Sequence, residues 1–191
     1  MHEILSRRDQ IIETASRLFK EKGFSAVTMR DLAGDLGIKA ASLYNHINSK
    51  QEILKSIIIS LADEFTEGMH RIKTSDINSI DKLKSIVDLH VKITSRNTFG
   101  MASLNNDWMH LEDQLDYYLE LRENYENDFR AIIQAGIDNG EILNRDVEVM
   151  LFSILSTLRS LYLWIPKKED LDAEQLSKDL SDTLIDGVKV C

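Results

Sequence analysis

The residues best suited to do chemistry lie between Thr28 and Lys50, and the chemistry is hydrogen bonding to another molecule. The stretch reads TMRDLAGDLGIKAASLYNHINSK and is rich in short polar, aromatic and cationic side chains. No Ser/His/Asp order, Gly-rich phosphate loop or Cys/His cluster stands out in the chain. Two short helices joined by a tight turn are predicted here, and such a unit can place side chains in a DNA groove.

The spacing of apolar residues predicts where these two helices begin and end. Thr28 is a plausible N-cap for the first helix, and Gly37 follows it where a left-handed residue is needed to end a helix. The second helix is predicted from Lys39 to Ile47, with Leu43 and Ile47 facing inward. Its outward-facing side chains are then Ala40, Ser42, Tyr44, Asn45 and His46.

The string from about Arg8 to Leu54 resembles the DNA-binding domain of TetR-family (tetracycline-repressor-like) transcriptional regulators. The resemblance covers IIETASRLFKEKGFSAVTM, the Leu-Gly-Ile turn, the Leu-Tyr-x-His core of the second helix and the x-Ser-Lys-x-x-Ile-Leu that follows. The chain departs from the family pattern at Lys39 and Ala41, where many members have Ser and Gly, and at Ile47, where many have Phe. The resemblance implies a helix-turn-helix head that binds a palindromic operator as a dimer.

The resemblance also implies which residues contact DNA. Phosphate contacts fix the register, whereas contacts to base edges specify the sequence. The positions that resemble the family's phosphate contacts are Thr28, Tyr44, His46 and Lys50. The positions that resemble its base-reading set are Arg30, Ala40, Ala41, Ser42 and Asn45, and Lys39 could reach either a base or a phosphate. Alternatives stay open for three residues. Tyr44 and His46 could be ordinary core or surface side chains, and Arg30 could pair with Asp31 or Asp35.

The charge distribution supports a DNA-binding head despite a net charge of −9. Residues 1–55 hold nine Lys/Arg and seven Asp/Glu, whereas residues 56–191 hold 14 and 25. Local charge decides the interaction because the Debye length is roughly 8 Å at physiological salt. Only the N-terminal part can approach phosphates without strong repulsion.

Composition predicts an all-α protein of about nine helices. One Pro, eight Gly and long 3.6-residue patterns favour helices throughout. We expect a three-helix head over residues 1–52 and a larger bundle for effector binding and dimerisation over residues 53–191. No run of about 18 apolar residues and no secretory signal stand out, so neither a membrane span nor a membrane partner is expected. The single Cys191 fits a reducing cytoplasm.

The last two predicted helices are the expected dimer interface. The helix from Val147 to Ile165 is apolar on nearly every side and must be covered all round. The helix from Ala173 to Val190 carries a complementary stripe of leucines. We therefore predict a four-helix bundle between two copies of the chain, as the family resemblance also implies.

From about Gln114 onward the chain also resembles TetR-type ligand domains that respond to acyl-CoA or related apolar acids. The resemblance lies in ENYENDFRAIIQAGIDNGEI and LRSLYLWIP, and it implies a pocket enclosed by the middle helices. The candidate lining residues are Phe99, Met101, Trp108, Met109, Tyr118, Arg122, Tyr125, Phe129 and Tyr162. Arg122 could anchor an effector anion, or it could pair with an acidic residue or extend to water. Each aromatic or Met residue could equally be plain core.

Two other classes of function stay open. The pairs Glu67-x-x-His70 and Asp107-x-x-His110 have the spacing used by di-iron carboxylate bundles, although that site also needs a Glu from each of two other helices. An adaptor that uses the helix-turn-helix only for packing is a further alternative. The interpretation we prefer is a regulator with no catalytic residues, no metal site and no cofactor.

Overall fold

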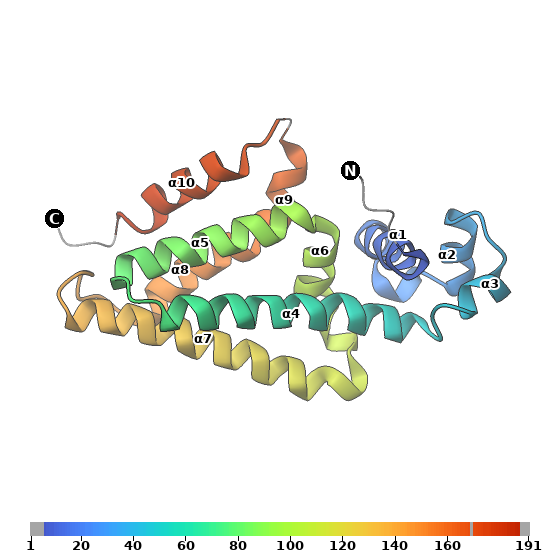
Figure 1. Ribbon diagram of the computed structural model, residues 1–191, viewed down its shortest axis with the longest axis horizontal. Coiled ribbons are helices and arrows are strands. Elements are labelled where there is room, and N and C mark those ends of the chain that lie inside the picture. Colours follow the sequence, from blue (N-terminus) through green and yellow to red (C-terminus); the bar gives the residue numbers. More distant parts are fainter. Residues whose placement is uncertain (1–5, 169, 188–191) are drawn as a thin grey trace. The chain divides into compact units, whose positions relative to one another are not determined.

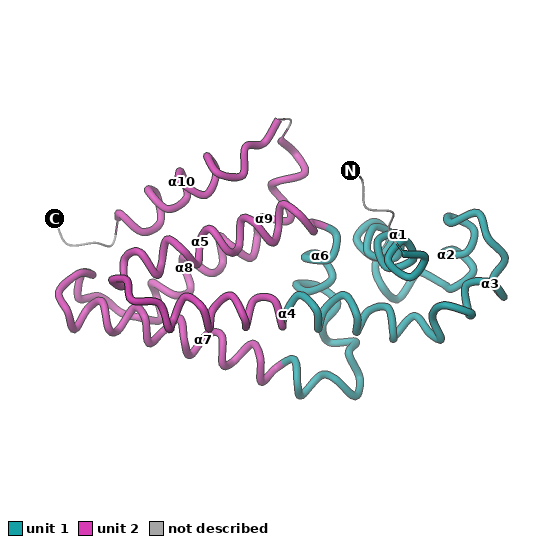
Figure 2. The backbone as a smooth tube through the Cα atoms, in the orientation of Figure 1, with its two compact units in different colours: residues 1–62, 99–118 teal, residues 63–98, 119–191 magenta. Residues whose placement is uncertain are grey.

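The computed structural model describes residues 6–168 and 170–187, and these residues form helices and connecting turns, with no strand among them (Figure 1). The all-α prediction is confirmed. The chain divides into two compact units, the first containing residues 1–62 and 99–118 and the second residues 63–98 and 119–191 (Figure 2). This structural division does not coincide with the functional boundary expected at residue 52, because residues 99–118 belong to the same unit as the N-terminal helices.

The first unit contains the predicted helix-turn-helix. Its elements are α1 (Arg7–Lys22), η1 (Phe24–Ala26), α2 (Met29–Asp35), α3 (Ala40–Tyr44), the start of α4 (Lys50–Thr74), most of α6 (Thr98–Asn106), η2 (Trp108–His110), η3 (Glu112–Gln114) and the start of α7 (Leu115–Asp138). Its fully buried apolar side chains include Ile11, Phe19, Leu32, Leu43, Ile47 and Leu54. Leu43 and Ile47 are thus inward, as their spacing predicts.

The two helices of the helix-turn-helix are fixed by local capping. Thr28 Oγ1 accepts the N–H of Asp31 at 3.2 Å, and the Asp31 carboxylate accepts the N–H of Thr28 at 2.8 Å, which satisfies two donors that the helix leaves unpaired. These hydrogen bonds lower the pKa of Asp31. Gly37 has φ +65°, a left-handed conformation that glycine adopts at little cost. The Ile38 N–H then bonds to the Ala33 carbonyl at 2.9 Å and closes the turn.

Helix α3 is shorter than the predicted segment from Lys39 to Ile47. Lys39 occupies the N-cap position, where its side chain makes no capping hydrogen bond. At the other end, the N–H groups of His46 and Ile47 both bond to the Leu43 carbonyl, at 3.0 and 3.2 Å. The regular helical hydrogen-bond ladder therefore covers only residues 40–44.

Helix α4 runs five residues beyond the predicted end at Met69, because Gly68 is a packing residue inside the helix. A Cβ atom added at Gly68 would lie 2.6 Å from the side chain of Leu89 on α5 (Ser79–Arg96). The absent side chain lets α4 and α5 approach closely, which offsets the low helix propensity of glycine. Gly136 on α7 has the same role, since its Cβ would lie 2.4 Å from Ile142.

The second unit is built on α5, the remaining parts of α4 and α7, and the C-terminal helices. The C-terminal elements are α8 (Val147–Arg159), α9 (Leu161–Trp164), η4 (Ile165–Lys167) and α10 (Ala173–Leu184). Helix α10 lies along α5 (Figure 1), and its buried face consists of Ser177, Ser181 and Ile185. The core side chains with almost no exposure include Leu83, Ile86, Val87, Phe129, Ile133 and Leu158.

Both predicted C-terminal helices differ from the observed ones. The helix expected from Val147 to Ile165 breaks at Ser160, whose hydroxyl bonds back to the Ser156 carbonyl at 2.8 Å and competes with the backbone ladder. The helix expected to reach Val190 ends at Leu184 in a turn through Gly187. Residues 188–190 lie outside the described part of the chain.

The segment Val147–Lys167 is long and apolar enough, by length and composition, to cross a membrane. The sequence pattern alone did not predict this. The finding is weak, since core helices of soluble proteins pass the same test. Less than half of the apolar window, 44%, is buried within the chain, which leaves an apolar surface on α8 and α9.

Candidate functional site

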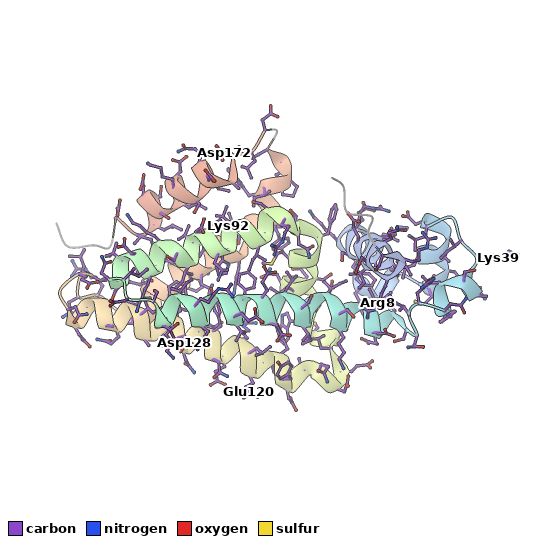
Figure 3. The ribbon with its side chains drawn as sticks, in the orientation of Figure 1. Arg8, Lys39, Lys92, Glu120, Asp128 and Asp172 are labelled. Atoms are coloured by element: carbon purple, nitrogen blue, oxygen red, sulfur yellow. The ribbon has the colours of Figure 1, made fainter. Side chains whose placement is uncertain are left out.

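The outward face of α2 and α3 carries the predicted DNA contacts. Six of those side chains are exposed and make no hydrogen bond or ion pair with any other described residue: Arg30, Lys39, Ser42, Tyr44, Asn45 and His46. Lys39 lies in the turn before α3, and its side chain extends away from the ribbon (Figure 3). Ala41 is also exposed, and Ala40 is half-buried. The sequence thus presents one face of donors, acceptors and methyl groups that the fold itself does not use.

Arginines on other faces of the first unit are paired, in contrast to Arg30. Arg17 bonds to Asp35 at 2.5 Å and to Glu21 at 3.0 Å, which raises the pKa of Arg17. Arg8 reaches Glu52 at 3.3 Å. Because Arg17 occupies Asp35 and Thr28 occupies Asp31, the two carboxylates considered as partners for Arg30 are both engaged elsewhere.

Lys50 points inward in this conformation. Its Nζ donates to the carbonyl oxygens of Phe24 at 2.7 Å and Val27 at 2.8 Å, and approaches that of Ser25 at 3.4 Å. It also lies 4.2 Å from the centre of the Phe24 ring, and burial lowers the pKa of Lys50. A phosphate contact by Lys50, as the family pattern implies, would require it to release one of these carbonyls.

The segment of residues 99–118 supplies further contacts within the first unit. The ring of His110 stacks on Phe24 with centroids 5.2 Å apart, and the Lys20 ammonium lies 5.1 Å above the Phe99 ring. The Asp107 carboxylate accepts the Phe24 backbone N–H, while burial raises the pKa of Asp107. These contacts join residues more than 70 positions apart, so no local sequence pattern could reveal them.

The predicted ligand-lining residues of the first unit have mixed environments. Phe99 and Met109 are exposed, Met101 and Tyr118 are buried, and Trp108 stacks on Tyr118 with ring centroids 6.1 Å apart. In the second unit Tyr125, Phe129 and Tyr162 are all buried. Five of these residues thus lie in one unit and four, including Arg122, in the other.

Arg122 shares a carboxylate with a second arginine. Its Nε lies 3.3 Å from Glu126 Oε1, one helical turn later on α7, and Arg159 of α8 reaches the same oxygen at 2.7 Å. The two guanidinium groups lower the pKa of Glu126 although burial opposes the shift. Two cations with one carboxylate leave a local excess of one positive charge. All three side chains are partly exposed, with fractions between 23% and 37%.

A buried polar pair near this cluster was not singled out from the sequence. His90 Nε2 on α5 lies 2.8 Å from the Tyr125 hydroxyl, and Phe65 packs against the imidazole with ring centroids 4.6 Å apart. Burial lowers the pKa of His90 to about 3 and raises that of Tyr125, and the positive charge of Arg159 lowers both. The position of His90 on the apolar face of its helix was the only available signal.

An apolar surface covers the outer side of the C-terminal helices. On α8, Phe152 is 70% exposed and Val149 is 61% exposed, while Leu163 and Trp164 of α9 are also exposed. Two open grooves of about 510 and 530 Å³ flank α8. The predicted stripe of α10, comprising Leu176, Leu180 and Leu184, lines these grooves and is only half-buried.

The residues of the di-iron alternative serve other purposes. Glu67 is exposed and pairs with Arg71 at 3.8 Å, while His110 stacks on Phe24. Across the described residues, no group of three or more His, Cys, Asp or Glu is placed to hold a metal ion.

Comparisons with known proteins agree with this geometry. A family model described as "Bacterial regulatory proteins, tetR family" matches residues 11–57, and one described as "Tetracyclin repressor-like, C-terminal domain" matches residues 76–188. The chain is 24% identical over 185 residues to the HTH-type transcriptional repressor KstR2 of Rhodococcus jostii (strain RHA1), covering 95% of this chain and 91% of that one. It is 22% identical over 185 residues to the fatty acid metabolism regulator protein of Bacillus subtilis (strain 168), covering 94% of each.

A solved structure has the same fold. The ketosteroid transcriptional regulator KstR2 of Mycobacterium tuberculosis superposes with a TM-score of 0.91 at 22% identity, covering 99% of this chain and 98% of that one. The two family matches together account for the head and most of the second unit. The chain belongs to the TetR family, and it is a ligand-responsive, DNA-binding transcriptional regulator.

Proposed function

We propose that this protein is a cytoplasmic homodimeric repressor that binds a palindromic operator and leaves it when an apolar, acyl-CoA-like effector binds. The observation that carries the DNA-binding part is the α2–α3 face, where six exposed polar side chains have no partner among the described residues. Unpaired donors and acceptors grouped on one helix-turn-helix face suit contacts to base edges and phosphates. The functional boundary proposed is residue 52, with DNA recognition before it.

Within that face, the residues divide by their chemistry. Arg30, Ser42 and Asn45 are the proposed base readers, since a guanidinium suits guanine and an amide suits adenine. Ala40 and Ala41 offer methyl contacts to thymine. The proposed phosphate contacts are Thr28, Tyr44 and His46, with Lys39 beside them and Lys50 once it releases its carbonyls.

The proposed dimer interface is the apolar surface of α8, α9 and α10. A side chain such as Phe152, exposed to 70% beside the half-buried leucines of α10, is costly to leave in water. A second copy of the same surface would cover both by a two-fold arrangement. Burying a large aromatic side chain contributes about 2 to 3 kcal/mol, so a few such residues can hold a dimer together.

The proposed effector has an apolar body and an anionic group. The partly exposed cluster of Arg122, Glu126 and Arg159 carries one excess positive charge, which a carboxylate, phosphate or CoA group could neutralise. The buried aromatics Tyr125, Phe129 and Tyr162 of the same unit suit an apolar body. The printed names of two relatives, a fatty acid metabolism regulator and a ketosteroid regulator, fit an effector of this kind.

Release would follow from a population shift. An effector that binds better to a conformation with wrongly spaced DNA-binding heads lowers operator affinity by the difference in its own affinities. Helix α4 is the proposed connection, because it is continuous from Lys50 to Thr74 and contributes to both units.

Operator selection from a random DNA pool tests the DNA-binding proposal. We expect wild-type protein to enrich a palindrome, and Asn45→Ala to lose the preference at one symmetric pair of positions. Glu67→Ala, at an exposed site on α4, serves as the matched control and should enrich the wild-type sequence. Enrichment of no sequence by protein freed of bound small molecules would contradict the proposal.

A further inference from the structure

The imidazole of His90 lies in the core of the second unit, and one of its ring nitrogens lacks a partner. The residue is 3% exposed and is enclosed by Phe65 of α4 and Tyr125 of α7. Nε2 meets the Tyr125 hydroxyl at 2.8 Å, whereas Nδ1 has no hydrogen-bond partner among the described residues. An unpaired polar atom in a core is costly, so it calls for a physical explanation.

The protonation state of this pair follows from burial. Burial holds the pKa of His90 at about 3, so the ring is neutral near pH 7 and carries one proton. Tyr125 keeps its proton because burial raises its pKa, and His90 Nε2 is the hydrogen-bond partner that the structure gives this hydroxyl. The hydroxyl therefore donates to Nε2, and the imidazole proton resides on Nδ1. Nδ1–H is an unpaired donor.

A second unpaired hydroxyl lies one helical turn away. Thr94 of α5 is fully buried, and residues four apart share one face of a helix. Its Oγ1 has no partner among the described residues. Threonines elsewhere in this unit behave differently, since Thr74 and Thr98 each bond back to the carbonyl one turn earlier, at 2.8 and 3.0 Å. Thr94 forgoes this bond.

We propose that His90 Nδ1–H and Thr94 Oγ1–H together recognise a ketone oxygen on the apolar body of the effector. A carbonyl oxygen has two lone pairs and can accept both hydrogen bonds, which would satisfy both donors. A carboxylate suits the site less well, because neither donor is charged and the core is dry. The anionic end of the effector is served by Arg122 and Arg159. This inference rests on the proposed function and narrows its effector class to apolar acids or thioesters that carry a ketone.

Two matched probes test the inference on the intact protein. One is a decalin carboxylate, and the other is its keto derivative with the ketone on the ring remote from the carboxylate. Calorimetric titration gives the affinity ratio of the two acids. We expect wild-type protein to bind the keto acid about tenfold more tightly, as a hydrogen bond to an otherwise unpaired buried group implies.

The variants separate this site from the rest of the pocket. Thr94→Val keeps the shape and removes the hydroxyl, so the preference for the keto acid should fall while the affinity for the parent acid stays. Thr74→Val makes the same change at an exposed position and should keep the ratio. Arg159→Gln should weaken both acids by one factor and also leave the ratio unchanged.

A second readout does not depend on substitution. The 15N resonance of His90 Nδ1 should move when the keto acid binds and should stay when the parent acid binds. Equal affinities of wild-type protein for both acids, or an unchanged ratio in Thr94→Val, would overturn the ketone site alone. Binding of neither acid would overturn both the ketone site and the proposed apolar effector.

Discussion

The ammonium of Lys50 lies 2.7 Å from the carbonyl oxygen of Phe24 and 4.2 Å from the centre of the same residue's ring. The first residue of α4 is thereby bound to the turn that precedes α2. The contact also connects α4 to the base of the helix-turn-helix, since Val27 accepts from the same ammonium. Lys50 thus positions the head in addition to any role on DNA.

Replacing Lys50 with Met should therefore destabilise the folded protein. Removing the ammonium leaves the buried carbonyls of Phe24 and Val27 without a donor, at a cost of about 1 to 3 kcal/mol. Lys39→Met makes the same change at an exposed, unpaired position and should alter stability by less than about 0.5 kcal/mol. Urea unfolding without DNA measures both. Equal stability of the two variants would refute a positioning role for Lys50.

Arg30 and Tyr44 should differ in how they affect operator binding. Arg30→Ala removes a proposed base reader, so we expect relaxed preference at one position of each half-site and a loss of about 1 to 3 kcal/mol. Tyr44→Phe removes a proposed phosphate contact and should weaken all sequences by a similar factor. Binding to a set of single-base operator variants measures both effects. A uniform loss with Arg30→Ala would exclude base reading by this residue.

His90 should make stability depend on pH below about 6.5. The unfolded chain takes up a proton near that pKa, whereas the folded protein resists it down to about 3, so stability falls as the pH is lowered through this window. Between pH 7 and pH 5 the expected loss is about 2 kcal/mol. His90→Phe should lack this component, whatever its absolute stability. Parallel pH profiles for wild type and His90→Phe would contradict a neutral buried imidazole.

Phe152→Asp should dissociate the dimer without unfolding the subunit. The side chain is 70% exposed in the isolated chain, so the folded monomer loses little, while a charge at the proposed interface is costly to bury. Ile77→Asp changes another exposed apolar residue outside that surface and should leave the dimer intact. Sedimentation velocity distinguishes the outcomes. A dimer that persists in Phe152→Asp would place the interface elsewhere.

The sequence predicts what depends on neighbours in the chain. The inward faces of Leu43 and Ile47, the cap at Thr28 and the left-handed Gly37 all follow from spacing within a few residues. The pairing of His90 with Tyr125 could not be predicted, because it joins residues 35 positions apart through the packing of α5 on α7.

Other features depended on a balance that spacing does not record. Lys50 turns inward because the carbonyls of residues 24–27 are presented to it, which the family pattern of phosphate contacts does not encode. Gly68 favours an early end to α4 by propensity, yet its close approach to Leu89 keeps the helix intact. The break at Ser160 likewise depends on a side-chain bond to the backbone.

The most direct test of the whole account is operator affinity in the presence of acyl-CoA thioesters, measured by fluorescence anisotropy on the selected palindrome. Chain lengths should be varied, and occupancy should be measured separately by equilibrium dialysis. The account predicts that a thioester which occupies the protein lowers operator affinity by about 5- to 150-fold, the usual range of allosteric coupling. A thioester that is bound at saturation yet leaves operator affinity unchanged would contradict it.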